Sequence, residues 1–457
     1  MTGSTALWRT RNEGTRCLDS WKYFFFHSCL GARAEEAWTL QKCIDYALQN
    51  NPDLQAAQAK VQGSTYDVDF QRKSFFPHLD LTASSGYFDG EPLSPFAILR
   101  GVTEEGIRSV RVSGGYVSAI PALTVPVLEE GVLFGLHAPT INVAAMQVVI
   151  DQKTYEANKN ETIFNVGSSF LNLLRNEEDI KSAQEHLNTL TLDHRTASSK
   201  YKEELISKNE LLVAEVRLAS GKKEFTTYTN LSKALTADLA ARMGLDPSTP
   251  MIISEESWAV PPLPPLDQLI TTAITHRAET KAQEARVSQT EEEHRVAKNE
   301  RYPNISVNSS FGVGYHRGSR SNTLWTATLD LTMPLFDFGA QGSKIDSLNA
   351  KVIEAERILR SIKINVSHEV ITAWTNMSNA MSAIVLRENM VEQSLENARV
   401  VRGRFQQNLV PLSAVLETDY TNYDAHKALA QAKYDLRTGY LELEKAVGTY
   451  LMPVSQK

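Results

Sequence analysis

The sequence has few cysteines, no long apolar run and no cluster of basic residues. No window approaches the roughly 18 consecutive apolar residues of a membrane-spanning helix, which excludes a helical integral membrane protein but not a barrel of short alternating strands. The formal net charge is −7 without any basic block, which argues against a nucleic-acid-binding surface. Because 42% of the 457 residues are hydrophobic, the chain can still bury a substantial core.

Residue patterns typical of enzymes are also absent. His368 and Glu369 begin like a zinc-binding helix, but Thr372 stands where H-E-x-x-H requires a second histidine. The glycines of residues 312–318 have the wrong spacing for a dinucleotide-binding loop, and the ten histidines form no ligand cluster. We therefore expect no enzymatic activity and no catalytic, cofactor-binding or metal site.

Residues 1–34 are predicted to be a secretory signal peptide, with a disordered tail as the alternative. Basic residues precede a short apolar run, residues 23–30, and residues 32–34 (ARA) match an A-x-A cleavage pattern. Two of the three cysteines lie in this segment, so Cys43 alone remains and can form no internal disulfide. No lipid-attachment pattern precedes a cysteine, so we predict no acyl anchor.

The chain contains an internal duplication. Leu40 and Leu266 each open a stretch that ends at a proline after an aromatic residue, Pro77 and Pro303, at the same offset of 226. Each copy is predicted to run helix, two strands, long helix, long helix. The expected organisation is residues 35–260 as the first repeat, 261–265 as a proline-rich joint, 266–451 as the second repeat and 452–457 as a tail.

Two segments in each copy predict unusually long helices. Residues 141–200 and 342–407 lack proline and are rich in helix formers, so each predicts a rod of roughly 90 Å. Residues 207–243 and 413–450 repeat alanine and leucine at helical spacing and are the expected partners. We expect coiled-coil packing, because such helices must cover a narrow apolar stripe.

The turns between these helices are predicted near residues 205–208 and 409–412, at the far ends of the rods. Ser207 and Ser413 are the expected N-caps, and Pro411 lies within the second turn.

Alternating apolar and polar residues predict four strands. In the second copy these are residues 304–315 and the segment around 325–333; in the first copy they are 78–88 and 111–127, with an expected bulge near Gly114 and Gly115. The predicted lipid-facing residues of the last strand are Trp325, Ala327, Leu329, Leu331 and Met333. A half-buried hairpin of a soluble protein is the alternative.

Four strands cannot close a barrel that keeps an open lumen, so a membrane-spanning sheet predicts a homo-oligomer. The loops between paired strands, residues 89–110 and 316–322, differ in length as outer-membrane loops do. We expect the strand–helix junctions to be marked by Pro77, Pro126, Pro303 and Pro334, and tight entry into the long helices to be permitted by Gly131 and Gly339.

The order of these motifs resembles that of the TolC-like outer membrane efflux proteins. The resemblance covers roughly residues 38–451 and rests on WTL, AL and NNPDL at 38–40, 47–48 and 50–54, PLFDFG at 334–339, and NLV, VLE and NYDA at 408–410, 415–417 and 422–425. It implies a mainly α fold with a small β part: a trimeric conduit with a twelve-stranded barrel in the outer membrane and a helical cylinder across the periplasm.

The resemblance further implies a passive duct of an efflux or type I secretion system, without a cofactor, that docks at its tips onto an adaptor protein and an inner-membrane pump. Best-known family members carry two acidic residues three apart at the second tip, where this chain has Ala414 and Glu417. We expect Glu417 and Glu210 to face the pore, with solvated glutamates as the alternative. The other expected tip residues are Leu205, Ile206, Leu409 and Val410. A soluble periplasmic adaptor or scaffold is the alternative function, and the cargo is left open.

Overall fold

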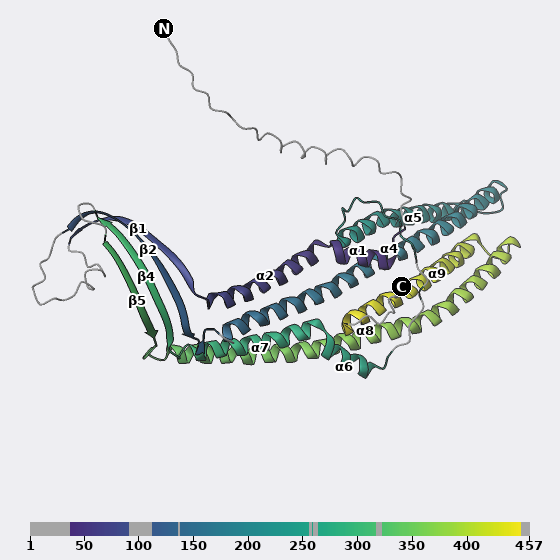
Figure 1. Cartoon of the computed structure of the whole chain (residues 1–457). Coiled ribbons are helices and arrows are strands. Elements are labelled where there is room, and N and C mark those ends of the chain that lie inside the picture. Colours follow the sequence, from purple (N-terminus) through teal and green to yellow (C-terminus); the bar gives the residue numbers. More distant parts are fainter. Residues whose placement is uncertain are drawn as a thin grey trace, which may run out of the picture.

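The computed structural model describes residues 37–90, 112–135, 138–255, 258, 264–316 and 322–448. The expected signal segment, residues 261–263 of the joint, the C-terminal tail and most of both strand loops lie outside the described residues. The molecule is elongated, with the strands gathered at one end and the helices running away from them (Figure 1). Within the described ranges, no helix combines the length and apolar character needed to cross a membrane.

Both copies have the same order of elements, except for one short strand in the first copy. The first contains α1 Leu40–Asn50, α2 Pro52–Ser74, β1 His78–Gly90, β2 Val112–Glu129, a short β3 Val132–Leu133, α4 Pro139–Lys202 and α5 Lys208–Met243. The second contains α6 Leu266–His276, α7 Ala278–Asn299, β4 Asn304–His316, β5 Asn322–Thr332, α8 Ala340–Gln406 and α9 Leu412–Val447. The mainly α fold with a small sheet is therefore confirmed.

The prediction of one helix before the strands is wrong, because two helices meet there in each copy. Asn51 adopts an extended backbone between α1 and α2. Its side-chain oxygen accepts hydrogen bonds from the Asp53 and Leu54 amides, at 2.8 and 3.3 Å, which caps α2. Its amide nitrogen donates to the Arg242 carbonyl of α5 at 2.9 Å, so this one buried side chain ties two helix ends together.

Arg277 occupies the corresponding break in the second copy. It is also extended and buried, and its guanidinium pairs with Glu279 at 3.1 Å and with Glu369 of α8. The second copy thus holds the same kink with ion pairs, where the first copy uses an asparagine cap.

The last helix of each copy ends at a glycine in the left-handed region. Gly244 has φ 81° and Gly448 has φ 74°, and the two positions are 204 residues apart. A Cβ on Gly244 would lie 2.9 Å from the Asn50 carbonyl oxygen, so α5 ends directly against the kink described above.

The long helices α4 and α8 have 64 and 67 residues, or roughly 100 Å at 1.5 Å per residue. They run from the sheet to the far tips, where α4 pairs with α5 and α8 with α9 (Figure 1). Apolar side chains fill the body between them, including Phe170, Met243, Met377 and Tyr440.

The strands form one antiparallel sheet in the order β1-β2-β4-β5, so pairing of β2 with β4 joins the two copies. The bulge expected near Gly114 and Gly115 is absent, since β1 and β2 keep a continuous register there. The irregularity lies instead between Pro126 and Leu128, in the pairing of β2 with β4. Proline has no N–H to donate to the ladder, which explains this position.

Each face of the sheet has its own chemistry. One row of paired positions is apolar, as in Ile305 with Leu331 and Val307 with Leu329. The opposite face pairs Asn308 with Thr328 and Ser310 with Thr326, whose hydroxyl oxygens are 2.7 Å apart. The alternation predicted from the sequence is therefore present across the sheet.

Candidate functional site

The two hairpin tips have the same backbone conformation. Glu204 and Asn408, which are 204 residues apart, have φ values of 59° and 57°. The following amides, of Leu205 and Leu409, donate to carbonyls five residues earlier, at 2.9 and 3.0 Å, and so satisfy the ends of α4 and α8. The turns at both tips are therefore well formed, with hydrogen-bonded helix ends.

The helices that leave these turns begin differently. Ser207 caps α5 as predicted, in a reciprocal capping box with Glu210. The prediction that Ser413 caps α9 is wrong, because α9 begins at Leu412 and its N-cap position is Pro411, which offers no side-chain cap. Proline cannot supply an acceptor side chain, so the first amides of α9 need a partner from elsewhere.

Glu210 provides that partner from the other hairpin. One carboxylate oxygen accepts from the Ser207 amide at 3.1 Å, while the other accepts from the Leu412 amide at 3.3 Å. A single half-buried carboxylate thus caps α5 and α9 at once. A second link between the tips runs from the Lys200 ammonium to the Asn408 side-chain oxygen, at 3.1 Å.

Glu417 lies one turn beyond the start of α9 and is more exposed than Glu210. Its carboxylate pairs with Arg217 of α5 at 3.3 Å, and 65% of its side chain is accessible. The Arg217 guanidinium also lies 5.8 Å from the centre of the Tyr420 ring. The predicted acidic residue at the tip is therefore solvent-accessible and has a cationic neighbour on the facing hairpin.

Apolar residues hold the tips together beneath these charges. Ile206 and Val410 pack against a cluster that includes Leu190, Phe405 and Leu416. Leu205 and Leu409, by contrast, are 61% and 68% exposed at the turns themselves. Of the four apolar tip residues selected from the sequence, two are partly buried against the core and two are exposed.

At the sheet, the second-copy junction residues lie beside the strand ends. Pro303 immediately precedes β4, and Pro334 follows the end of β5. Gly339, with φ 88°, is the N-cap residue of α8. Asp337 accepts from the Gln341 and Gly339 amides at 2.6 and 3.0 Å, and these backbone bonds lower the pKa of its carboxyl group.

The first-copy junction is longer. Pro77 immediately precedes β1, but Pro126 lies inside β2. Gly131, with φ 75°, lies in the turn from β2 into β3, and α4 begins only at Pro139. Glu130 supplies the helix cap by accepting from the Thr140 amide at 3.3 Å.

The predicted lipid-facing residues share one exposed side of β5 and its end. Trp325, Leu329 and Leu331 are 67%, 71% and 65% exposed, Ala327 is also exposed, and Met333 follows the last residue of the strand. Such a row of large apolar side chains facing outward is unusual unless something apolar covers it.

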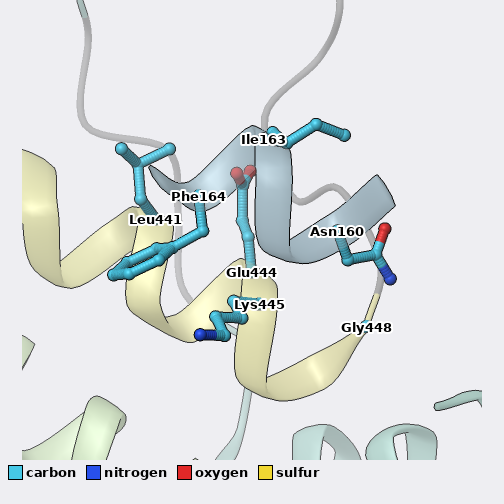
Figure 2. A pocket seen from close by; sticks show the side chains of 7 residues that line it. All are labelled: Asn160, Ile163, Phe164, Leu441, Glu444, Lys445 and Gly448. Atoms are coloured by element: carbon cyan, nitrogen blue, oxygen red, sulfur yellow. The ribbon is translucent and has the colours of Figure 1, made fainter. Parts of the chain in front are cut away.

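A small hollow in the helical body lies between α4 and α9 and has a volume of about 20 Å³ (Figure 2). The Lys445 ammonium sits 4.5 Å from the Phe164 ring centre and pairs with Glu161. The hollow holds about one water molecule, too little for a cargo. The described part of the chain also contains no group of acidic, cysteine and histidine side chains able to hold a metal ion.

Sequence reasoning missed the second carboxylate bond of Glu210 and the charged group that the buried carboxylates of Asp193 and Asp419 form with Arg402. The bond between Glu210 and the Leu412 amide joins residues 202 apart, so no local sequence pattern predicts it. Asp193, by contrast, continues a heptad spacing that the sequence does display.

Comparisons with known proteins agree with this architecture. The family model described as "Outer membrane efflux protein" matches residues 43–245 and 269–449. Protein CyaE of Bordetella pertussis is 22% identical over 75% of this chain and 70% of its own, and outer membrane protein TolC of Escherichia coli K12 is 21% identical over 91% and 83%. The Campylobacter jejuni CmeC outer membrane channel superposes with a TM-score of 0.76 at 17% identity, covering 90% of this chain and 85% of that one.

The family match favours an outer-membrane channel over the soluble adaptor considered from the sequence. It assigns the sheet to the outer membrane and the helices to the periplasm, and the family consists of transport channels. The chain therefore belongs to the outer membrane efflux protein family.

Proposed function

We propose that the chain forms a passive trimeric duct from the periplasm to the exterior. Each chain contributes two membrane hairpins, the duplicated repeats span residues 35–260 and 266–451, and residues 261–265 connect them. The observation that carries the proposal is the sheet, in which an exposed apolar face, including Leu329, backs a polar face, including Asn308 and Thr328. Lipid outside and water inside is the environment that matches these faces.

The trimer follows from barrel geometry. A four-stranded sheet cannot enclose an open lumen, whereas three copies supply twelve strands, enough for a water-filled interior. Strands β1 and β5 are the two ends of the sheet and would pair between neighbouring chains. A pump in the inner membrane and a periplasmic adaptor would complete an efflux or type I secretion assembly, and the pump would select the cargo.

The hairpin tips would form the periplasmic entrance. Glu417 is accessible at the tip, and Glu210 lies nearby. Repeated around a threefold axis, these carboxylates would create a negative constriction that attracts cations. The exposed leucines Leu205 and Leu409 would narrow the same opening or meet the adaptor.

Single-channel recording in planar bilayers tests the duct and its entrance together. The purified protein should extract from the outer-membrane fraction as a trimer and conduct with cation selectivity. Glu417→Ala should reduce that selectivity, while Glu396→Ala, an exposed carboxylate on α8 paired with Arg399, should leave it unchanged. A soluble monomer without conductance would refute the duct. Unchanged selectivity in Glu417→Ala would refute the role of that carboxylate.

A further inference from the structure

A stripe of polar side chains runs along the face of α4 that meets the other helices. Buried positions on this face follow a spacing of alternately three and four residues, as in a coiled-coil seam. The stripe alternates the polar residues Asp179, His186 and Asp193 with the apolar residues Ala183, Leu190 and Ala197, all of them buried. Polar residues at core positions of a coiled coil lower stability and specify how the helices pair.

The seam ends in a group of three charges from three helices. The Arg402 guanidinium of α8 binds Asp193 of α4 at 3.2 Å and also binds Asp419 of α9. The two carboxylates are 6% and 10% exposed. Arg402 therefore links the α4–α5 hairpin to the α8–α9 hairpin just above the tips.

This group holds one negative charge more than it can neutralise. With both aspartates ionised, two carboxylates share one guanidinium, and the second oxygen of Asp193 is buried without a hydrogen-bond partner. Burial raises the pKa of Asp419 to about 6. The nearby Arg402 guanidinium lowers this pKa, and repulsion from the Asp193 carboxylate raises it. Burial likewise raises the pKa of Asp193. One bound proton would remove the excess charge and supply a donor for the unpaired oxygen.

The neighbouring layer contains the other titratable groups of the seam. The His186 ring stacks on Tyr423 of α9, with ring centres 4.3 Å apart. Glu224 of α5 pairs with Lys427 of α9 at 3.4 Å, and Arg217 of α5 acts on His186 as a nearby cation. Burial lowers the pKa of His186, which disfavours the charged form of this ring in the packed state.

We propose that Asp193, Arg402 and Asp419 form a proton-operated lock, in which one shared proton fastens the two hairpins together and holds the tips closed. The consequence for transport rests on the proposed function, whereas the coupling of the hairpins does not.

The direction of the pH effect follows from the raised pKa of Asp419. A carboxyl group whose pKa is higher in the locked state than in the open state stabilises the locked state in acid, and this contribution is lost as the pH rises through about 6. If the pKa of Asp419 returns to its ordinary value of 3.8 in the open state, the ratio of open to closed tips should fall about tenfold between pH 7.5 and pH 5. His186 acts in the opposite direction, since its lowered pKa disfavours the packed state in acid.

The experiment records open probability of the full-length trimer in planar bilayers from pH 7.5 to 5, for the wild type and Asp419→Asn. The amide imitates the protonated acid and leaves His186 in place, so the difference between the two proteins isolates the lock. In the wild type the ratio of open to closed channels should fall about tenfold as the pH falls, with a midpoint near pH 6. Asp419→Asn should be closed at every pH. Glu396→Gln, an exposed carboxylate on α8, should behave as the wild type.

A second readout measures the hairpins without relying on conduction. Spin labels at the exposed Leu205 and Leu409 report the distance between the two tips. The distance distribution should narrow at pH 5 in the wild type and stay narrow at every pH in Asp419→Asn. A wild type without this response, or an Asp419→Asn protein that retains it, would overturn the lock. A responsive distance in a protein that never conducts would instead count against the duct alone.

Discussion

Glu210 offers the sharpest test of how the tips are held, because one side chain caps two helices from different copies. Glu210→Ala removes the capping-box bond to Ser207 and the bond to the Leu412 amide. Loss of an N-terminal cap costs about 1 kcal/mol, and a charged hydrogen bond to a partly exposed amide adds a similar amount. The first turn of α5 and the first turn of α9 should therefore each open with about 1 kcal/mol less free energy, or roughly fivefold more often.

Glu210→Gln separates the two contributions. Glutamine also fits a capping box, so the cap on α5 should persist, while the loss of charge weakens the bond to Leu412. We expect the first turn of α9 to open more often in this variant, but by a smaller factor than in Glu210→Ala, with α5 little changed.

Hydrogen exchange measured by mass spectrometry reads these local openings directly. Peptides covering the starts of α5 and α9 should exchange faster in Glu210→Ala, and those from the middle of α4 should not. Glu203→Gln is the matched control, since the structure gives this exposed neighbour no side-chain hydrogen bond within the described residues. If α9 exchanges equally fast in the wild type and in Glu210→Ala, the carboxylate does not cap that helix.

Three further predictions concern the body, the sheet and the thiol. Gly244→Ala should lower the free energy of unfolding by about 1–3 kcal/mol in thermal unfolding, because its backbone is left-handed and the added Cβ would meet a carbonyl oxygen. Gly342→Ala, in open space on α8, should instead stabilise the protein by about 0.5–1 kcal/mol. Equal effects of the two substitutions would contradict this explanation. Leu329→Arg should lower the stability of the membrane-inserted protein by roughly 2–4 kcal/mol and reduce its insertion into liposomes. Thr328→Arg, on the opposite face of the sheet, should insert normally. Similar insertion yields for the two variants would count against a lipid-facing Leu329. Burial raises the pKa of Cys43 to about 12, so peptide mapping should find this thiol alkylated at pH 7.5 only after denaturation, and rapid labelling of the native trimer would refute its burial.

Much of the fold follows from periodic patterns that the sequence displays directly. Proline-free stretches and period-two alternation predicted the long helices and the strands. These features depend on residues close together in the chain, so local physical chemistry decides them.

The errors have a common physical origin in contacts between distant residues. The break at Asn51 carries a local signal, an asparagine before proline, but Arg277 shows no such signal and is held by Glu369 of another helix. Ser413 was predicted as the cap because serine is favoured at N-cap positions, yet α9 begins at Leu412, which is buried and whose amide binds the Glu210 carboxylate. The Arg402 group likewise joins residues from three helices and could not be assembled from spacing alone.

The joining of the copies through β2 and β4 has a consequence for assembly. Because the four strands alternate in direction, the two edge strands of each sheet, β1 and β5, run in opposite directions. Neighbouring chains related by rotation can therefore continue the alternation without a mismatched seam, whatever their number. The direction of the strands therefore does not determine the number of subunits, which must depend on the curvature of the sheet and on how the long helices pack side by side.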